Sequence, residues 1–190
     1  FFLIFSSLSF WQIGRITEKN TIVDAIKQAN EKRDLNLEQI PIDTINDFHY
    51  FKVRIDGRFD PDSCLFVENV VRRGRQGYYV YCIYIPHNSE YLLLVNLGWL
   101  QQQGDRRDLP QYEIDVVEGT IEGVIQQPRS KPVITPGDGI PNPEHEQLWS
   151  YFDFTKLAHD LGKPLYPIEL QLLTEIDQKL DRQWPEFQAK

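Results

Sequence analysis

The sequence contains no methionine, only two cysteines, and no apolar run long enough to cross a membrane by itself. Residues 1–10 are apolar except for three serines, and the run ends before Arg15, whereas a membrane-spanning helix needs ~20 apolar residues. Trp11, Gln12, Arg15 and Lys19 follow it, and indole rings settle at a bilayer interface with cationic groups just beyond. No signal-peptide cleavage site is evident. We therefore expect residues 1–17 to be the end of an N-terminal transmembrane anchor, with a small buried helix as the alternative.

The chain also lacks an excess of basic residues. Its 190 residues include 20 Lys and Arg against 28 Asp and Glu, for a net charge of −8. This balance argues against a nucleic-acid partner, because such proteins usually carry a basic patch on a basic domain. Hydrophobic residues make up 41% of the chain, which is enough to form the core of one domain.

The two cysteines are too few for the disulfide framework of a small secreted protein. Cys64 and Cys82 each lie in a predicted strand, so they could pair. We favour the interpretation that they are two separate thiols in the core, and cysteine usage therefore does not identify the compartment.

Catalytic signatures are missing as well. There is no G-x-S-x-G, H-E-x-x-H or P-loop motif, and the four histidines are scattered, at positions 49, 87, 145 and 159. A nucleophilic pair of cysteine and histidine is disfavoured because a thiol among strand hydrophobics is normally inert. We expect no catalytic residue and no metal site, and we interpret the chain as a binding or assembly module.

Most of the sequence from residue 48 onward predicts strands. Phe51, Val53 and Ile55 alternate with charged residues, and three further strands are predicted over residues 64–71, 77–85 and 91–100. Residues 112–125 predict another strand or a bulged pair, and residues 165–173 a last one. Helices are predicted over residues 18–33 and 153–161, the second ending at Gly162.

The connections between these strands are too short for crossover helices, so the sheet should be largely antiparallel. Closure would remove its open edges. The predicted fold class is α+β: a mainly antiparallel, barrel-like sheet over residues 48–173 with a few flanking helices, following the N-terminal anchor.

A basic cluster, Arg72, Arg73 and Arg75, falls in a predicted hairpin loop. Three guanidinium groups there could hold a carboxylate or a phosphate, haem propionates included, by charge-assisted bonds. A solvated turn that blunts the edges of the sheet is the alternative interpretation.

Several short motifs occur in an order that is similar to a known family. They are Trp11-Gln12-Ile13-Gly14-Arg15, Gly57-Arg58-Phe59, Glu68-Asn69, Gly74 through Gly77-Tyr78, Asn96-Leu97-Gly98-Trp99 and Arg182-Gln183-Trp184. Together they resemble the surfeit locus protein 1 family of cytochrome c oxidase assembly factors, in its bacterial form. The chain departs from the family pattern at Leu97, where arginine is usual, at Val70, and at Cys82-Ile83.

The resemblance implies a protein of the bacterial inner membrane. Residues 18–190 would form a globular domain facing the periplasm, and a C-terminal transmembrane helix would be absent from this chain. The implied function is to assist haem A insertion or to stabilise an early subunit 1 intermediate. The implied partners are cytochrome c oxidase subunit 1, haem A delivery proteins and the membrane. No cofactor is expected in this fragment, although the full-length protein could bind haem A.

Two alternatives to this function remain open. One is a periplasmic hydrolase that uses Asp60, Asp62 or Glu68, and the other is a purely structural binding module. For the motif residues we expect structural roles: Gly77 and Gly98 should allow close backbone approach, and Asn69 and Asn96 should bond backbone groups at bends.

Overall fold

The computed structural model describes residues 35–103, 112–114, 118–128, 147–177 and 179–184, apart from the side chain of Asn69. The chain divides into two compact units, one of residues 34–183 and one of residues 1–33 with 184–190. The fold given below is that of the first unit. The anchor expected over residues 1–17 and the helix expected over residues 18–33 lie outside the described residues. Among the residues that are described, no helix is long and apolar enough to cross a bilayer.

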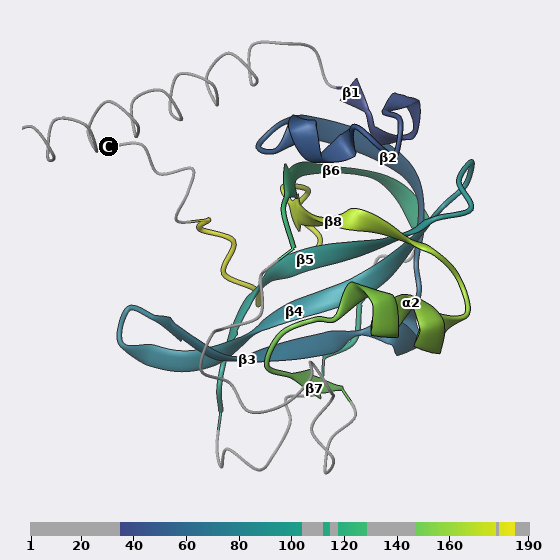
Figure 1. Cartoon of the computed structure of the whole chain (residues 1–190). Coiled ribbons are helices and arrows are strands. Elements are labelled where there is room, and N and C mark those ends of the chain that lie inside the picture. The colour runs from purple at the N-terminus through teal and green to yellow at the C-terminus, as the bar shows by residue number, and fades with distance from the viewer. Residues whose placement is uncertain (1–34, 104–111, 115–117, 129–146, 178, 185–190) are drawn as a thin grey trace, which may run out of the picture. The chain divides into compact units, whose positions relative to one another are not determined.

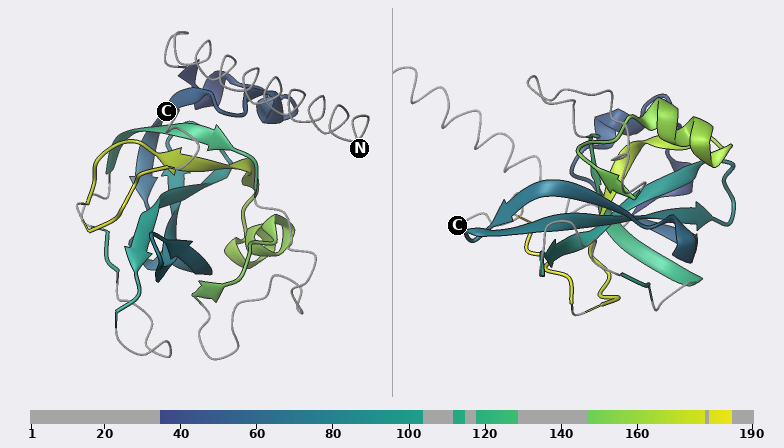
Figure 2. Two further views of the ribbon diagram at one scale, coloured as in Figure 1. Left: turned by 90° about the vertical axis from the view of Figure 1, so that its left-hand side faces the viewer. Right: turned by 90° about the horizontal axis from the view of Figure 1, so that it is seen from below.

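Eight strands in the described part of the chain form one sheet, in the order β1-β2-β6-β8-β5-β4-β3-β7 (Figure 1). Their bounds are β1 (Leu35–Asn36), β2 (Lys52–Phe59), β3 (Leu65–Arg72), β4 (Arg75–Pro86), β5 (Leu92–Gln101), β6 (Glu118–Gln126), β7 (Leu148–Trp149) and β8 (Leu165–Leu172). Because β2 also pairs with β4, the strands β2, β6, β8, β5 and β4 form a ring, which the left view of Figure 2 shows enclosing a common interior. The expected curled sheet is therefore present as a ring of strands.

Pairing in this sheet is mainly antiparallel, as expected, but β1–β2, β3–β7 and β5–β8 are parallel pairs. Short connections exclude a parallel pair only between the strands that they join, and residues 37–51 between β1 and β2 are not a short connection. Because β6 and β7 lie between β5 and β8 in the sequence, the chain has ample length to return in the parallel direction. The strand predicted over residues 112–125 starts only at Glu118, and residues 112–114 are not strand.

The core lies inside the ring and follows from the alternation of apolar residues. In β2 the buried residues Val53, Ile55 and Phe59 alternate with exposed charged residues. The other ring strands contribute inward-facing residues to the same cluster, among them Tyr78, Val80, Tyr84, Leu93, Val95, Leu97, Ile121, Ile125, Ile168, Leu170 and Leu172. Burying one such side chain contributes ~1.5–3 kcal/mol, so the filled interior stabilises the ring.

A second layer lies outside the ring and contains α2 (Phe154–Leu161). The side chain of Asp153 caps this helix by accepting bonds from the amides of Thr155 and Lys156, and Gly162 ends it with φ of 65°. The predicted helix is therefore confirmed. The preceding segment packs on β4, where the rings of Phe152 and Tyr81 meet edge-to-face at 4.9 Å.

Cys64 and Cys82 form a disulfide, so the expectation of two separate thiols is wrong. Both residues are buried, with 3% and 0% exposure. The antiparallel register of β3 and β4 pairs Leu65 with Tyr81, which brings the two cysteines opposite one another. Treating each cysteine as an independent core residue overlooked this register.

We expect the double substitution Cys64→Ala with Cys82→Ala to lower the free energy of unfolding by about 3 kcal/mol. The bond closes a loop with a sequence separation of 18 residues, and the chain-entropy model gives ~3 kcal/mol for a loop of this size. Urea unfolding of the variant and of the oxidised and reduced wild type would measure it. Equal stability of oxidised and reduced wild type would contradict the prediction.

Candidate functional site

Most of the described motif residues meet at one place, where the end of β5 contacts a segment near the C-terminus. We call residues 179–183 the C-terminal strap. Gly77 and Tyr78 lie on β4, Asn96, Gly98 and Trp99 lie on β5, and Arg72 ends β3. Gly57 lies elsewhere, on β2. Trp11, Gln12, Arg15 and the side chain of Asn69 are outside the described residues, and Trp184 belongs to the other compact unit.

The backbone of β5 contains a bulge at the motif Asn96-Leu97-Gly98-Trp99. On β4, Val80 pairs with Gly98 while Tyr81 pairs with Asn96, so Leu97 is the extra residue. The Asn96 side-chain oxygen accepts a hydrogen bond from the Gly98 amide at 3.2 Å, which confirms the expected backbone role of Asn96. Its Nδ2 atom is buried without a hydrogen-bond partner. The bulge therefore lies next to Trp99, the residue whose backbone bonds the strap.

Gly98 is required at this bulge for two physical reasons. Its φ of 143° lies in a region that side chains disfavour. A Cβ at this position would also lie 2.9 Å from the Cβ of Leu180 and 3.1 Å from the Cγ of Arg182. The strap therefore crosses β5 directly over Gly98, as expected of a glycine that allows close approach.

The strap is held to β5 mainly by backbone hydrogen bonds. The Trp99 amide donates to the Asp181 carbonyl at 2.9 Å, and the Asp181 amide donates to the Trp99 carbonyl at 2.8 Å. The Arg182 Nε donates to the Leu97 carbonyl at 3.0 Å, and Leu180 is buried. Asp181 thus forms an isolated antiparallel bridge with Trp99.

Arg72 ties the strap to the β3–β4 hairpin. Its side chain is only 10% exposed, and Nη1 lies 3.3 Å from the Asp181 carboxylate. The same guanidinium donates to the main-chain carbonyls of Asp181 and Gln183 and lies 5.6 Å from the ring centroid of Tyr79. Such charge-assisted bonds are stronger than bonds between neutral groups.

Trp99 completes this cluster from the side of β5. Its Nε1 donates to the carbonyl of Val70 on β3 at 3.2 Å. To reach β3, the indole passes over Gly77, where a Cβ would lie 2.5 Å from the ring. Gly77 therefore has the close-approach role that the sequence predicts.

The three arginines of the predicted anion site differ in their surroundings. Arg72 is already paired with a carboxylate, whereas Arg73 bonds the side-chain oxygen of Gln183 and Arg75 bonds that of Gln101 at 3.0 Å. Both Arg73 and Arg75 are exposed. A bound anion would therefore meet Arg73 and Arg75 first, and it would have to displace Asp181 to engage Arg72.

The acidic residues of the alternative hydrolase site lie at a different place. An open cavity of about 580 Å³ is lined by Asp60, Asp62, Lys156 and Asp160 together with apolar side chains. Asp60 caps the short 3-10 helix η3 (Pro61–Ser63), its side chain accepting from the Asp62 amide. The hydrogen bond from Lys156 lowers the pKa of Asp160, whereas a catalytic acid at neutral pH needs a raised pKa.

Neither Glu68 nor the histidines complete a catalytic group with these residues. Glu68 accepts a hydrogen bond from Ser150 at 3.0 Å. His49 bonds Gln126, His87 faces Glu118 and His159 faces Asp160, while His145 lies outside the described residues. In the described part of the chain, no three metal-ligating side chains come together. We call the residues that meet around Trp99 and the strap the motif cluster. They are joined by backbone hydrogen bonds and by the ion pair of Arg72 with Asp181, an arrangement suited to holding segments together.

We expect Gly98→Ala to destabilise the protein more than Gly119→Ala. The two glycines have nearly the same φ, 143° and 145°, but a Cβ at Gly119 has no atom within 4 Å. Gly119→Ala should therefore cost only the backbone strain of ~1–3 kcal/mol, and Gly98→Ala should add the displacement of the strap. Urea unfolding and hydrogen exchange at the Trp99 and Asp181 amides would separate these effects. Equal losses, with both amides still protected, would contradict the strap crossing.

Comparison with known proteins identifies the family to which the chain belongs. The SURF1 family model matches residues 1–189. A SURF1-like protein of Rickettsia prowazekii is 28% identical over 104 residues, which cover 54% of this chain and 41% of that protein. The cytochrome oxidase assembly protein SHY1 of Saccharomyces cerevisiae is 24% identical over 179 residues, which cover 89% of this chain and 43% of that protein. The chain thus spans less than half the length of these relatives. It belongs to the SURF1 family.

Proposed function

We propose that this chain is part of a membrane-anchored assembly factor for cytochrome c oxidase. The observation that carries the proposal is the family match over residues 1–189, together with the similarity to a cytochrome oxidase assembly protein over 89% of the chain. The arrangement of the motif residues fits such a role, because they hold a strap against a sheet and assemble no described catalytic group.

The finer proposal is that the protein assists haem A insertion or stabilises an early subunit 1 intermediate, in contact with subunit 1 and with haem A delivery proteins. The sheet would act as a docking surface beside the bilayer of the bacterial inner membrane. The disulfide between Cys64 and Cys82 supports a periplasmic location for this domain, because disulfides persist in oxidising compartments and are rare in the cytosol.

We further propose that haem A, where the full-length protein binds it, is not held by the histidines of this domain. Iron needs an axial ligand, usually an imidazole, inside an apolar slot that excludes water. The His49 Nε2 is 2.9 Å from the Gln126 side-chain oxygen, His87 is exposed, and the His159 side chain is 88% exposed. None of these three histidines is buried.

Complementation tests the assembly function. In a bacterium that lacks its own SURF1-family protein, the natural gene product containing this chain should restore cytochrome c oxidase activity. The ratio of haem A to subunit 1 in the membranes separates the two finer roles. A low ratio in the deletion strain indicates failed haem insertion, and scarce subunit 1 with a normal ratio indicates loss of an early intermediate. Failure of the wild-type gene to restore either quantity would exclude the proposal, provided that immunoblots show its product in the membrane.

Titration tests the haem proposal. We expect haem added to the purified 190-residue chain to give weak, non-saturating changes in the Soret band, because the described histidines lack an apolar slot. His49→Ala, His87→Ala, His145→Ala and His159→Ala should leave these changes as they are. Tight one-to-one binding that any one of the four substitutions abolishes would place a haem site in this domain.

A further inference from the structure

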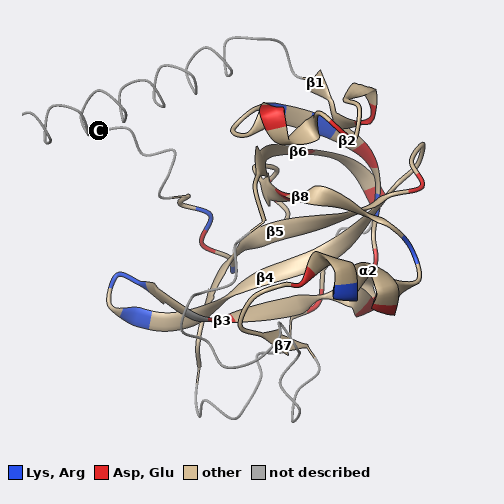
Figure 3. Ribbon diagram, in the orientation of Figure 1, with Lys and Arg blue, Asp and Glu red and all other residues tan. Residues whose placement is uncertain are grey.

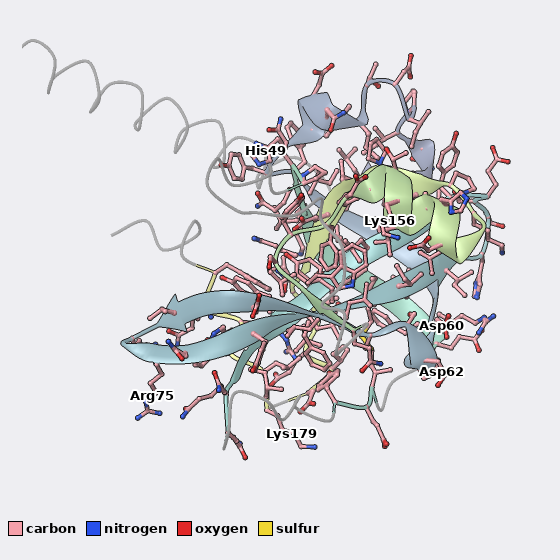
Figure 4. The ribbon with its side chains drawn as sticks, turned by 60° about the horizontal axis from the view of Figure 1, so that its bottom comes forward. His49, Asp60, Asp62, Arg75, Lys156 and Lys179 are labelled. Atoms are coloured by element: carbon pink, nitrogen blue, oxygen red, sulfur yellow. A yellow bond between two sulfur atoms is a disulfide. The ribbon has the colours of Figure 1, made fainter. Side chains whose placement is uncertain are left out.

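The β3–β4 hairpin extends beyond the ring of strands (Figures 1 and 2), and its end is both apolar and basic. We call residues 71–76 the hairpin tip. Val71 is 62% exposed, more than any other large hydrophobic side chain in the described part of the chain. Arg73 and Arg75 are exposed on the same tip, and Figure 4 shows Arg75 on this hairpin, on the opposite side of the view from Asp60 and Asp62.

The turn keeps an arginine at a position that favours other residues. Arg73 and Gly74 are the central residues of a two-residue turn, with φ of 48° and 73°. Turns of this kind favour asparagine, aspartate or glycine at both positions, because most side chains disfavour positive φ. Arg73 occupies the first position in spite of this backbone cost.

The positive charges of Arg73 and Arg75 are not neutralised within the described chain. Each bonds a neutral amide oxygen, that of Gln183 or Gln101, whereas Arg72 is paired with Asp181. The tip therefore carries unpaired positive charge on a chain whose net charge is −8. Figure 3 shows basic residues at the end of this hairpin and no acidic ones.

We propose that the hairpin tip binds the surface of an anionic lipid bilayer. Arg73 and Arg75 contact headgroup phosphates, and Val71 enters the boundary between headgroups and acyl chains. Basic residues are attracted to anionic leaflets within a Debye length of the surface, and apolar side chains beside them add shallow insertion.

The small area of the tip favours a lipid surface over a protein partner. A stable protein interface buries ~800 Å² on each partner, and a tip of two strands with one exposed apolar side chain offers much less. A bilayer needs no matching pocket and presents many phosphates. The inference rests on the proposed function only for the presence of a membrane, and vesicle binding is measured without any oxidase.

A fluorescent label on the tip tests the inference in the full 190-residue chain. Val71→Cys labelled with NBD reports on the tip, and Gln127→Cys, at an exposed position just after β6, serves as the reference label. Cys64 and Cys82 are in a buried disulfide and do not compete for the reagent. With phosphatidylcholine vesicles containing phosphatidylglycerol, the label at position 71 should shift to the blue and become protected from aqueous iodide. The label at position 127 should change little.

Charge reversal tests whether Arg73 and Arg75 are the groups that bind the vesicle surface. On the labelled background, Arg73→Glu with Arg75→Glu should weaken the response by at least about tenfold, as should high salt or vesicles of phosphatidylcholine alone. Arg58→Glu with Lys163→Glu makes the same change in net charge at exposed positions away from the tip and should have little effect. If the first pair lowers stability in urea unfolding, Arg73→Gln with Arg75→Gln replaces it.

Two results would overturn the inference. One is a label at position 71 that stays as accessible to iodide as the label at position 127, which would attribute vesicle binding to another segment. The other is an unchanged vesicle response in the Arg73→Glu, Arg75→Glu variant together with lost oxidase assembly, which would make the tip a site for an acidic protein. Failure of the wild-type gene to restore oxidase activity in the deletion strain, together with normal vesicle binding by the chain, would count against the proposed function alone.

Discussion

Closure of the ring at Gly57 is the constraint on which the rest of the structure depends. At this residue β2 pairs with Gly119 of β6 on one side and with Pro86 of β4 on the other. A Cβ on Gly57 would lie 2.3 Å from the Ile85 carbonyl oxygen and 2.8 Å from the Tyr84 ring, so no other residue lets the strands approach this closely. Inside the closed ring the Tyr84 hydroxyl donates its single proton to the Gly119 carbonyl, and the Ile55 carbonyl lies 3.3 Å from the same oxygen. Burial raises the pKa of Tyr84 far above its usual value, which keeps this donor protonated.

The motif cluster forms on β4 and β5, two neighbouring strands of the closed ring. They pair directly, and their register shifts at Leu97, close to Trp99, whose backbone bonds the strap. The side chain of Leu97 is fully buried in the core. The family resemblance places an arginine at this position, and a charge there would lack solvent or a partner among apolar side chains. The departure at Leu97 therefore fits the interior of this particular ring.

Apolar alternation predicts the ring strands and local capping predicts the helix, because each signal depends only on residues a few positions apart in the sequence. The strap carries no such signal, because backbone bonds at Asp181 hold it and residues 174–183 show no apolar period. For the same reason, nothing in the sequence marks Asp181 as the partner of Arg72 and Trp99. The disulfide and the parallel β5–β8 pair depend on register between distant strands. The sequence also could not separate Arg72 from Arg73 and Arg75, since only the fold shows that Arg72 is largely covered and paired with Asp181 while the other two are exposed.

The arginines of the hairpin therefore have two separate roles. Arg72 fixes the hairpin to the strap, and its bond to the Gln183 carbonyl places the last residue of this unit beside the hairpin. Arg73 also bonds the side chain of Gln183, so the strap ends close to the positive charges of the tip. Because β4 belongs to both the hairpin and the ring, and Trp99 and Asp181 connect the strap to β5, a force on the tip reaches the ring through β4 as well as through the motif cluster. A contact between the tip and an anionic surface would therefore orient the whole ring, and the bonds between the strap and β5 would add to this connection.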